Sequence, residues 1–195
     1  MDLFDTQLTP RQRINKISES VKVLNNITEN SGKTKKVFRL LDGKLSSFDG
    51  CTLFIRPAVP LTGFMSSKYD KKLLELCEIY KIYNKVITYG ILKRTKIAGR
   101  KVIKHNIKII EDIIELVEPK VIVVLGEVTS ELFLSTKLKV CNYHGTKIAS
   151  YGSGIPVLYT YDTSWYLEHD GYEDARYKQD ILHNDWTMIQ EEYNK

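Results

Sequence analysis

Apolar residues occur along the chain as short continuous runs and as stripes at helical spacing. Five consecutive residues, Val121–Leu125, are all Val, Ile or Leu and are followed directly by Gly126. A run without polar alternation predicts a strand that is covered on both faces, as in a parallel sheet. In such sheets, ligands bind outside the carboxyl ends of the strands. We therefore expect Gly126 and the loops beside it to form the functional edge of the molecule.

The remaining segments predict alternating strands and helices. Strand patterns bounded by turn residues, and apolar stripes at three- and four-residue spacing, distinguish the two kinds of element. The alternation predicts an α/β fold with a mostly parallel sheet, in which residues 1–34 form a helical extension packed on a domain over 35–195. The expected strands are 36–41, 52–55, 86–92, 121–125, 147–150 and 156–159, and the expected helices begin near 10, 67, 107, 127 and 173.

The composition is that of one ordinary globular domain. The chain has 195 residues, of which 43% are hydrophobic and 27% charged, and this length suits one core rather than two. No apolar run reaches membrane-spanning length, and the first residues show no secretory signal. The three cysteines are scattered and odd in number, so we expect neither a disulfide framework nor a Cys-x-x-Cys metal site. These features predict an intracellular, cytoplasmic protein, with a monomer favoured and no membrane partner.

Positive charge is concentrated in one loop. The formal net charge is +5 and the pI is near 8.9, which permits a polyanionic partner without requiring one. The densest cluster follows the expected strand 86–92 at its carboxyl end. One interpretation is that this loop contacts DNA phosphates, and the other is that it is a solvated surface loop. The candidate DNA contacts in it are Lys93, Arg94, Lys96, Arg100 and Lys101.

Several chemistries find no support in the sequence. Only one glycine begins the helix after Leu125, so neither a dinucleotide fingerprint nor a P-loop is present. No Gly-x-Ser-x-Gly elbow presents a nucleophilic serine. We expect no cofactor and no bound metal, because the histidines lack metal spacing and each is interpreted as a surface or packed residue. These histidines are His105, His144, His169 and His183.

The order of short motifs resembles the uracil-DNA glycosylase superfamily. A helix that ends in Pro119-Lys120-Val121-Ile122 runs into Leu125-Gly126 and a following helix. Four further motifs follow in the family's order, namely Gly145, Ile155-Pro156-Val157, Tyr161-Asp162-Thr163-Ser164-Trp165 and Asp185-Trp186. The similarity is greatest to the thermophile-type, iron–sulfur branch known as family 4, and it covers most of the chain beyond the first helix. It implies a three-layer α/β/α fold, a central, mostly parallel sheet of four to five strands, and DNA as a partner.

The chain departs from this family where the chemistry of excision resides. Cleaving the bond between base and sugar builds negative charge on the base and positive charge on the sugar, so the site needs a water-activating group and a donor to the base. The resemblance places Pro57 at the family's glutamate, Asp162 at its histidine and Tyr89 at its base-reading asparagine. Proline cannot activate water, and an ionised Asp162 would repel the anionic base. The four cluster cysteines are also missing, with Lys93 and Asn106 at two of their positions.

Three interpretations of function stay open at this point. In the first, the chain has lost uracil excision and acts as a DNA-binding accessory factor in replication or repair. In the second, it is an active DNA N-glycosylase for another base, with Asp162 as its catalytic carboxylate. In the third, it has a protein-interaction role without DNA. The residues expected to line the base pocket are Arg56, Pro57, Phe64, Tyr89 and Ser164.

For the segments beside the expected pocket, the sequence allows more than one interpretation. Trp165 and Tyr166 fall where the resemblance implies a loop that wedges into duplex DNA, and exposed rings there would stack on bases. The alternative is that they cap the core under the last helix. Asp162 also suits a turn or a helix cap. The constrained loop Arg56–Gly63 either leaves a pocket facing Asp162 open or fills it.

Abundant Lys, Ile, Tyr and Asn suggest an AT-rich genome, such as that of a phage.

Overall fold

The computed structural model describes most of the chain from Cys51 onward. The expected amino-terminal helix, apart from Gln12, and the domain boundary near residue 34 lie outside the described residues. The segments described are 38–40, 51–58, 68–82, 86–92, 118–134, 138–152, 154–168 and 175–195, with the single residues 12, 107, 110, 111, 114, 115 and 136.

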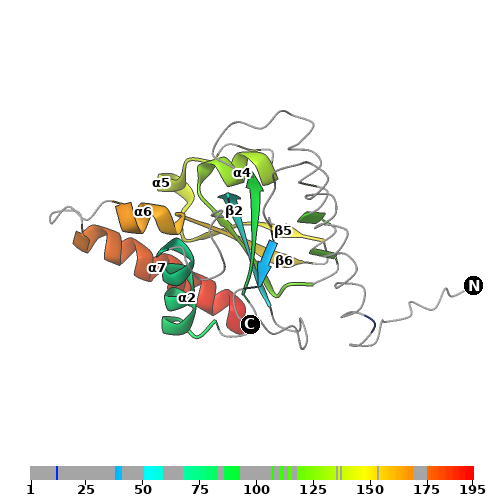
Figure 1. Ribbon diagram of the computed structural model, residues 1–195, viewed down its shortest axis with the longest axis horizontal. Coiled ribbons are helices and arrows are strands. Elements are labelled where there is room, and N and C mark those ends of the chain that lie inside the picture. Colours follow the sequence, from blue (N-terminus) through cyan, green and yellow to red (C-terminus); the bar gives the residue numbers. More distant parts are fainter. Residues whose placement is uncertain are drawn as a thin grey trace, which may run out of the picture.

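Six strands form one sheet in the described part of the chain (Figure 1). They are β1 (Phe38–Leu40), β2 (Thr52–Ala58), β3 (Val86–Leu92), β4 (Val121–Leu125), β5 (Thr146–Tyr151) and β6 (Ile155–Thr160). In the order β1-β3-β2-β4-β6-β5, the four central strands are parallel to one another, while β1 and β5 are antiparallel edge strands. The predicted α/β fold with a mostly parallel sheet is confirmed. The antiparallel edges bring the sheet to six strands, rather than four or five.

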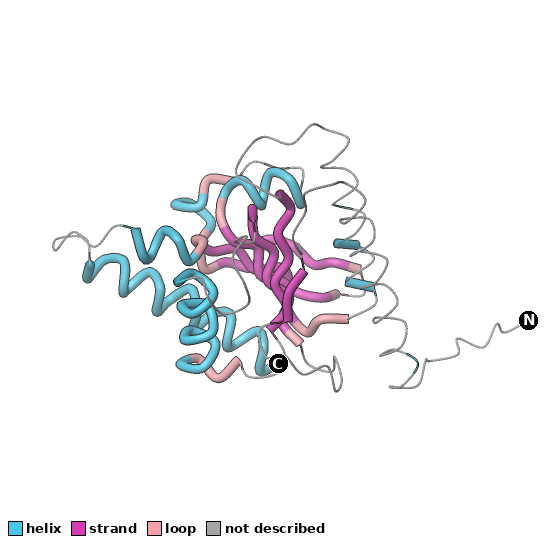
Figure 2. The backbone as a smooth tube through the Cα atoms, viewed as in Figure 1, coloured by secondary structure: helices cyan, strands magenta, loops and turns pink. Residues whose placement is uncertain are grey.

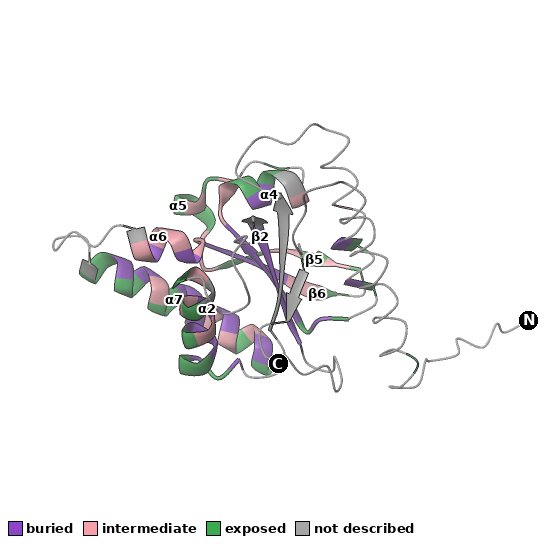
Figure 3. Ribbon diagram, in the orientation of Figure 1, coloured by how far each residue is buried: buried purple, intermediate pink, exposed green. Residues whose placement is uncertain are grey.

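Strand β4 lies in the interior of the sheet and behaves as its pattern predicts. All five of its residues are buried, and it pairs in parallel with β2 on one side and β6 on the other. Val123, for example, lies opposite both Phe54 and Leu158. In the ribbon of Figure 3, strands in the middle of the sheet are coloured as buried. A continuous apolar run was therefore the correct signal for a strand covered on both faces.

Helices pack against one face of this sheet. Figure 2 shows α2, α6 and α7 gathered together beside the strands, and α7 contacts both β4 and β6. Alternate strand residues face them, because successive side chains of a strand point to opposite sides. Phe54 stacks on Trp186 of α7 with ring centroids 5.8 Å apart. The helices described are α2 (Lys68–Ile79), α4 (Glu127–Leu134), α5 (Val140–Tyr143), α6 (Thr163–Glu168) and α7 (Ala175–Asn194).

The core between the sheet and these helices is apolar and continuous. Its strand residues come from β2, β4 and β6, and its helical residues come from α2 and α7. Each large side chain buried in this way contributes roughly 1.5–3 kcal/mol to folding. The core residues include Phe54, Leu73, Leu76, Val121, Val123, Leu125, Leu158, Trp186 and Ile189.

Strand β2 continues further than its sequence predicts. The loop was expected to begin at Arg56, but β2 runs to Ala58. Beyond Ile55, β2 pairs with β3 alone, where Arg56 lies opposite Gly90 and Ala58 opposite Leu92. Pro57 is tolerated there because a residue without an N–H group fits a strand that is paired on one side. Arg56 is therefore held by the sheet rather than by a loop.

Candidate functional site

The carboxyl ends of the parallel strands meet at one edge of the sheet. Arg56 lies near the end of β2, Gly126 directly follows β4, and Asp162 follows β6 by two residues. Leu125 of β4 is level with Thr160 of β6, so these positions lie at similar height. This is the edge where ligands of parallel sheets bind.

An ion pair crosses this edge above β4. Arg56 Nη2 donates to Asp162 Oδ1 over 3.0 Å and to Thr163 Oγ1 over 3.0 Å. Thr163 Oγ1 in turn donates to the same Asp162 oxygen over 3.1 Å. The Arg56 side chain is only 2% exposed, whereas that of Asp162 is 16% exposed. Because β4 lies between β2 and β6, the pair links β2 to the segment that follows a strand on the far side of β4.

Gly126 makes the turn that begins α4 beside this ion pair. Its φ of +80° is the left-handed conformation that glycine adopts without strain. Its N–H donates to the Thr160 carbonyl over 2.9 Å, and its own carbonyl accepts from Ser130. A Cβ atom at this position would lie 3.8 Å from Asp162 Cβ. Gly126 therefore lies at the carboxyl edge of the sheet as expected, while the function of that edge and a contact of Gly126 with DNA stay predictions.

Asp162 has the local geometry of a residue that begins a helix. It stands immediately before α6, and its backbone carbonyl accepts from Trp165 N over 2.9 Å. This arrangement fits the turn and capping role that Asp-Thr-Ser predicts. The side chain is also charge-paired with Arg56, so the carboxylate does not stand alone in the site.

The two aromatic residues of α6 have different environments. Trp165 stacks on Tyr161 with centroids 3.9 Å apart, and Lys178 Nζ lies 5.1 Å from the Trp165 ring centroid. Tyr166 is 9% exposed, and its hydroxyl lies 3.2 Å from Thr160 Oγ1. Burial raises the pKa of Tyr166. The expectation of an exposed Tyr166 that wedges into DNA is therefore wrong for this structure, because the ring caps the core as in the alternative.

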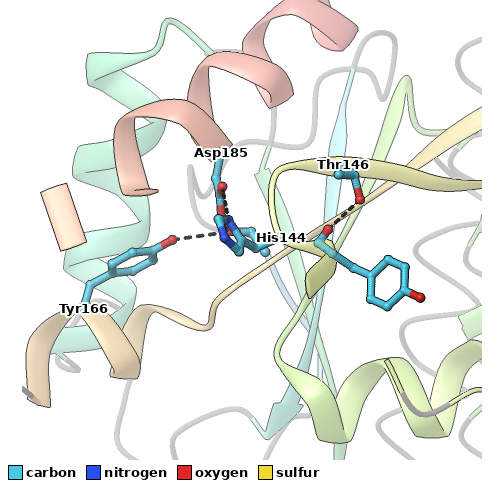
Figure 4. Close-up of polar contacts among 6 residues, drawn as sticks. His144, Thr146, Tyr166 and Asp185 are labelled. Atoms are coloured by element: carbon cyan, nitrogen blue, oxygen red, sulfur yellow. Dashed lines mark hydrogen bonds and ion pairs between the residues drawn. The ribbon is translucent and has the colours of Figure 1, made fainter. Parts of the chain in front are cut away.

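A second pair, formed by a histidine and a carboxylate, lies near the end of β6. His144 Nδ1 lies 2.7 Å from Asp185 Oδ1, with the His144 side chain 24% exposed and that of Asp185 1% exposed (Figure 4). Thr160 Oγ1 donates a very short hydrogen bond to the other Asp185 oxygen. Since Thr160 donates there, the Tyr166 hydroxyl is the donor to Thr160. The result is a chain of contacts from buried Tyr166 to the surface imidazole.

Gly145 gives Asp185 the room to reach His144. Gly145 has a φ of +64°, and a Cβ atom there would lie 2.5 Å from Asp185 Oδ1, which is too close for any side chain. Burial is the main cause that raises the pKa of Asp185, while its hydrogen bonds with His144 and Thr160 oppose the rise. Sequence reasoning treated His144 as a surface or packed residue and missed this pair. The signal that could have found it was the glycine directly after the histidine.

The structure describes the other predicted site residues only in part. Pro57 lies in β2, and Tyr89 lies in β3 opposite Ile55, three residues before that strand ends; their side chains are outside the described part. Ser164 is half-buried in α6. Phe64 and all five candidate DNA contacts of the basic loop lie outside the described residues, namely Lys93, Arg94, Lys96, Arg100 and Lys101.

Within the described residues, no group of three or more His, Cys, Asp or Glu side chains is arranged to hold a metal ion. None of the helices in that part of the chain is both long and apolar enough to cross a membrane.

No family model matches the chain, and no curated protein matches it significantly.

Proposed function

We propose that the chain is a DNA-binding accessory factor of replication or repair that does not excise uracil. In this proposal its fold is the three-layer α/β/α arrangement of the uracil-DNA glycosylases, and DNA lies along the carboxyl edge of the sheet. The observation that carries the loss of excision is the buried ion pair between Arg56 and Asp162.

The chemistry of excision explains why this pair matters. A glycosylase needs a group that activates water and stabilises a sugar cation, and donors aimed at the departing base. Asp162 already has a neutralising partner, and the Arg56 guanidinium donates to protein atoms rather than into an open site. Arginine stays charged at every physiological pH, so the guanidinium remains a cationic partner beside the carboxylate. The side chains that meet here hold one another instead of a reacting group.

DNA binding is supported by the net charge of the chain and by the position of its densest basic cluster in the sequence. The formal net charge is +5, and the densest basic cluster starts at Lys93, directly after β3 ends at Leu92. Strand β3 is parallel to β2, so its carboxyl end, which the cluster follows in the sequence, lies at the same edge as Arg56. Proteins that bind DNA through backbone phosphates carry clusters of Lys and Arg.

One observation favours a second candidate, an N-glycosylase for a base other than uracil. Asp162 keeps 16% exposure and lies beside Gly126, which has no side chain to cover it. In this candidate a flipped base approaches Asp162 from the Gly126 side. It predicts base release that Asp162→Asn abolishes.

Binding and base release measured on the same oligonucleotides test both candidates. Fluorescence anisotropy with single- and double-stranded DNA is expected to show binding that weakens steeply with salt. Changing Lys93, Arg94 and Lys96 to Ala is expected to lower the salt slope by roughly 0.7–0.9 for each phosphate that is no longer neutralised. Base release is tested with uracil, hypoxanthine and modified pyrimidines, and none is expected to yield abasic sites. No binding at low salt would reject the proposal, and release that depends on Asp162 would favour the second candidate.

A further inference from the structure

The two carboxylate oxygens of Asp162 have different surroundings. Oδ1 accepts hydrogen bonds from Arg56 Nη2 over 3.0 Å and from Thr163 Oγ1 over 3.1 Å. Oδ2 accepts none within the part of the chain that the structure describes. The Asp162 side chain is 16% exposed, whereas the Arg56 side chain that holds it is 2% exposed. One oxygen therefore fixes the carboxylate to the protein, and the other is able to accept from a group outside it.

Gly126 leaves room beside Asp162. It directly follows β4 at the carboxyl edge of the sheet and begins the turn into α4. A Cβ atom added there would lie 3.8 Å from Asp162 Cβ, and apart from the chain neighbours of Gly126 no other described atom lies within 4 Å of that place. Any other residue at this position would put a side chain next to the carboxylate.

The charge state of Asp162 decides which groups it can recognise. A carboxylate in an ion pair accepts hydrogen bonds and has no proton to donate. Cytosine and adenine carry an exocyclic amino group where uracil, thymine and hypoxanthine carry a carbonyl oxygen. An amino group would donate to Oδ2, as cytosine donates to Asp and Glu in known DNA complexes. A carbonyl oxygen would instead place two acceptors against each other, and the remaining donor of uracil lies between two such oxygens.

We propose that Asp162 is a base-reading residue that accepts a hydrogen bond, through Oδ2, from the exocyclic amino group of an unpaired cytosine or adenine. This inference rests on the proposed DNA binding and adds to it a preference for amino over keto bases in single strands. Arg56 and Thr163 are positioning residues, because they orient the carboxylate before a base arrives. Phosphate contacts give affinity for any sequence, while the contact with Asp162 distinguishes between bases.

The first test needs only the wild type. Fluorescence anisotropy compares oligo-dC with oligo-dU of the same length, which carry the same phosphates and differ by the exchange of amino for keto. The affinity for oligo-dC is expected to be roughly tenfold higher, which is the difference that one hydrogen bond to a charged group makes. The salt slopes are expected to be equal, because the phosphates are the same. Oligo-dA and oligo-dI repeat the exchange on a purine.

The second test assigns the preference to Asp162. Asp162→Asn keeps the size of the side chain, but its amide can donate as well as accept, so the affinities for oligo-dC and oligo-dU are expected to become similar. Asp180→Asn, at an exposed position on α7, removes the same charge elsewhere and is expected to keep the preference. Thermal melts check that the variants are folded. Asp162→Ser, which also suits the start of α6, is the second variant should Asp162→Asn not fold.

The outcomes separate this inference from the proposed function. If the wild type binds none of these strands at low salt, the proposed function fails and the inference fails with it. If it binds oligo-dC and oligo-dU equally well, only the inference is rejected. A preference for oligo-dC that is as large in the Asp162 variants as in Asp180→Asn would reject Asp162 as the residue that reads the base.

Discussion

Two pairs of a carboxylate and a basic side chain lie near the end of β6, and their burial is opposite. In the first, the Arg56 side chain is 2% exposed and that of Asp162 is 16% exposed. In the second, the carboxylate of Asp185 is 1% exposed and the His144 ring is 24% exposed. The first pair buries a cation that cannot lose its charge, so it is fixed. The second presents an imidazole to solvent and holds it from beneath with a buried carboxylate.

This difference separates two parts of the carboxyl edge. The Arg56–Asp162 pair joins β2 to the segment that follows β6, across β4. The His144–Asp185 pair orients a surface group from beneath. Four changes to the protein test this division, in order of decreasing expected effect.

Arg56→Met is expected to lower the free energy of unfolding by about 3 kcal/mol, because it leaves the Asp162 charge partly buried without its partner. The measurement is urea unfolding at neutral pH. The double variant Arg56→Met/Asp162→Asn is expected to lose less than the sum of the single changes. Arg176→Met, at an exposed position on α7, is the control. A loss no greater than in this control would show that the pair does not fix the edge.

Gly145→Ala is expected to destabilise the fold by about 2 kcal/mol, since it adds crowding against Asp185 to the strain of a positive φ. Gly152→Ala is the matched control. Gly152 also has a positive φ, +51°, but no other group lies within 4 Å of the place that its added methyl would take. The control is expected to lose about 1 kcal/mol from backbone strain alone. Equal losses in the two variants would contradict a close approach between Gly145 and Asp185.

Tyr166→Phe is expected to cost about 1 kcal/mol, because it removes one hydrogen bond to Thr160 while the bond from Thr160 to Asp185 remains. Tyr177→Phe, on the 64% exposed Tyr177, is the control. Urea unfolding of both proteins measures the difference. A change no larger than that of the control would place the Tyr166 hydroxyl outside the chain of contacts.

The smallest effect is expected in the pH dependence of stability. Burial raises the pKa of Asp185 above its ordinary value of 3.8, so the folded chain binds this proton more tightly than the unfolded chain. The stability from this group is therefore present below pH 3.8 and is lost as the pH rises through the raised pKa. Asp185→Asn is expected to remove that part of the pH dependence. Unfolding midpoints from pH 3.5 upward measure it, and an unchanged profile would reject the assignment to Asp185.

Much of the fold could be predicted from the sequence because its signals are local. The all-apolar run Val121–Leu125 was a buried strand with the predicted bounds, and the strand Val86–Leu92 also has its predicted bounds. The end of β2 was misjudged because Pro57 suggests a loop wherever the pairing of its strand is unknown. That pairing on one side alone is a property of the sheet, not of the local sequence.

The candidate site was less predictable because its contacts join distant parts of the chain. Arg56 and Asp162 are 106 residues apart, and His144 and Asp185 are 41 residues apart. Both aspartates were singled out from motifs, but no pattern in a single sequence identifies the cation that each one meets. Both an exposed and a core-capping Tyr166 stayed open because the sequence around an aromatic residue is the same whether its ring points outward or into the core.

Base release from a bound, uracil-containing single strand tests the central claim most directly. Protein and labelled oligonucleotide are mixed at low salt, binding is followed by anisotropy, and the same sample is treated with alkali to reveal abasic sites. The proposed function predicts saturable binding, and the ion pair between Arg56 and Asp162 is the reason that no abasic sites are expected. Abasic sites that form with the wild type and disappear with Asp162→Asn would contradict it.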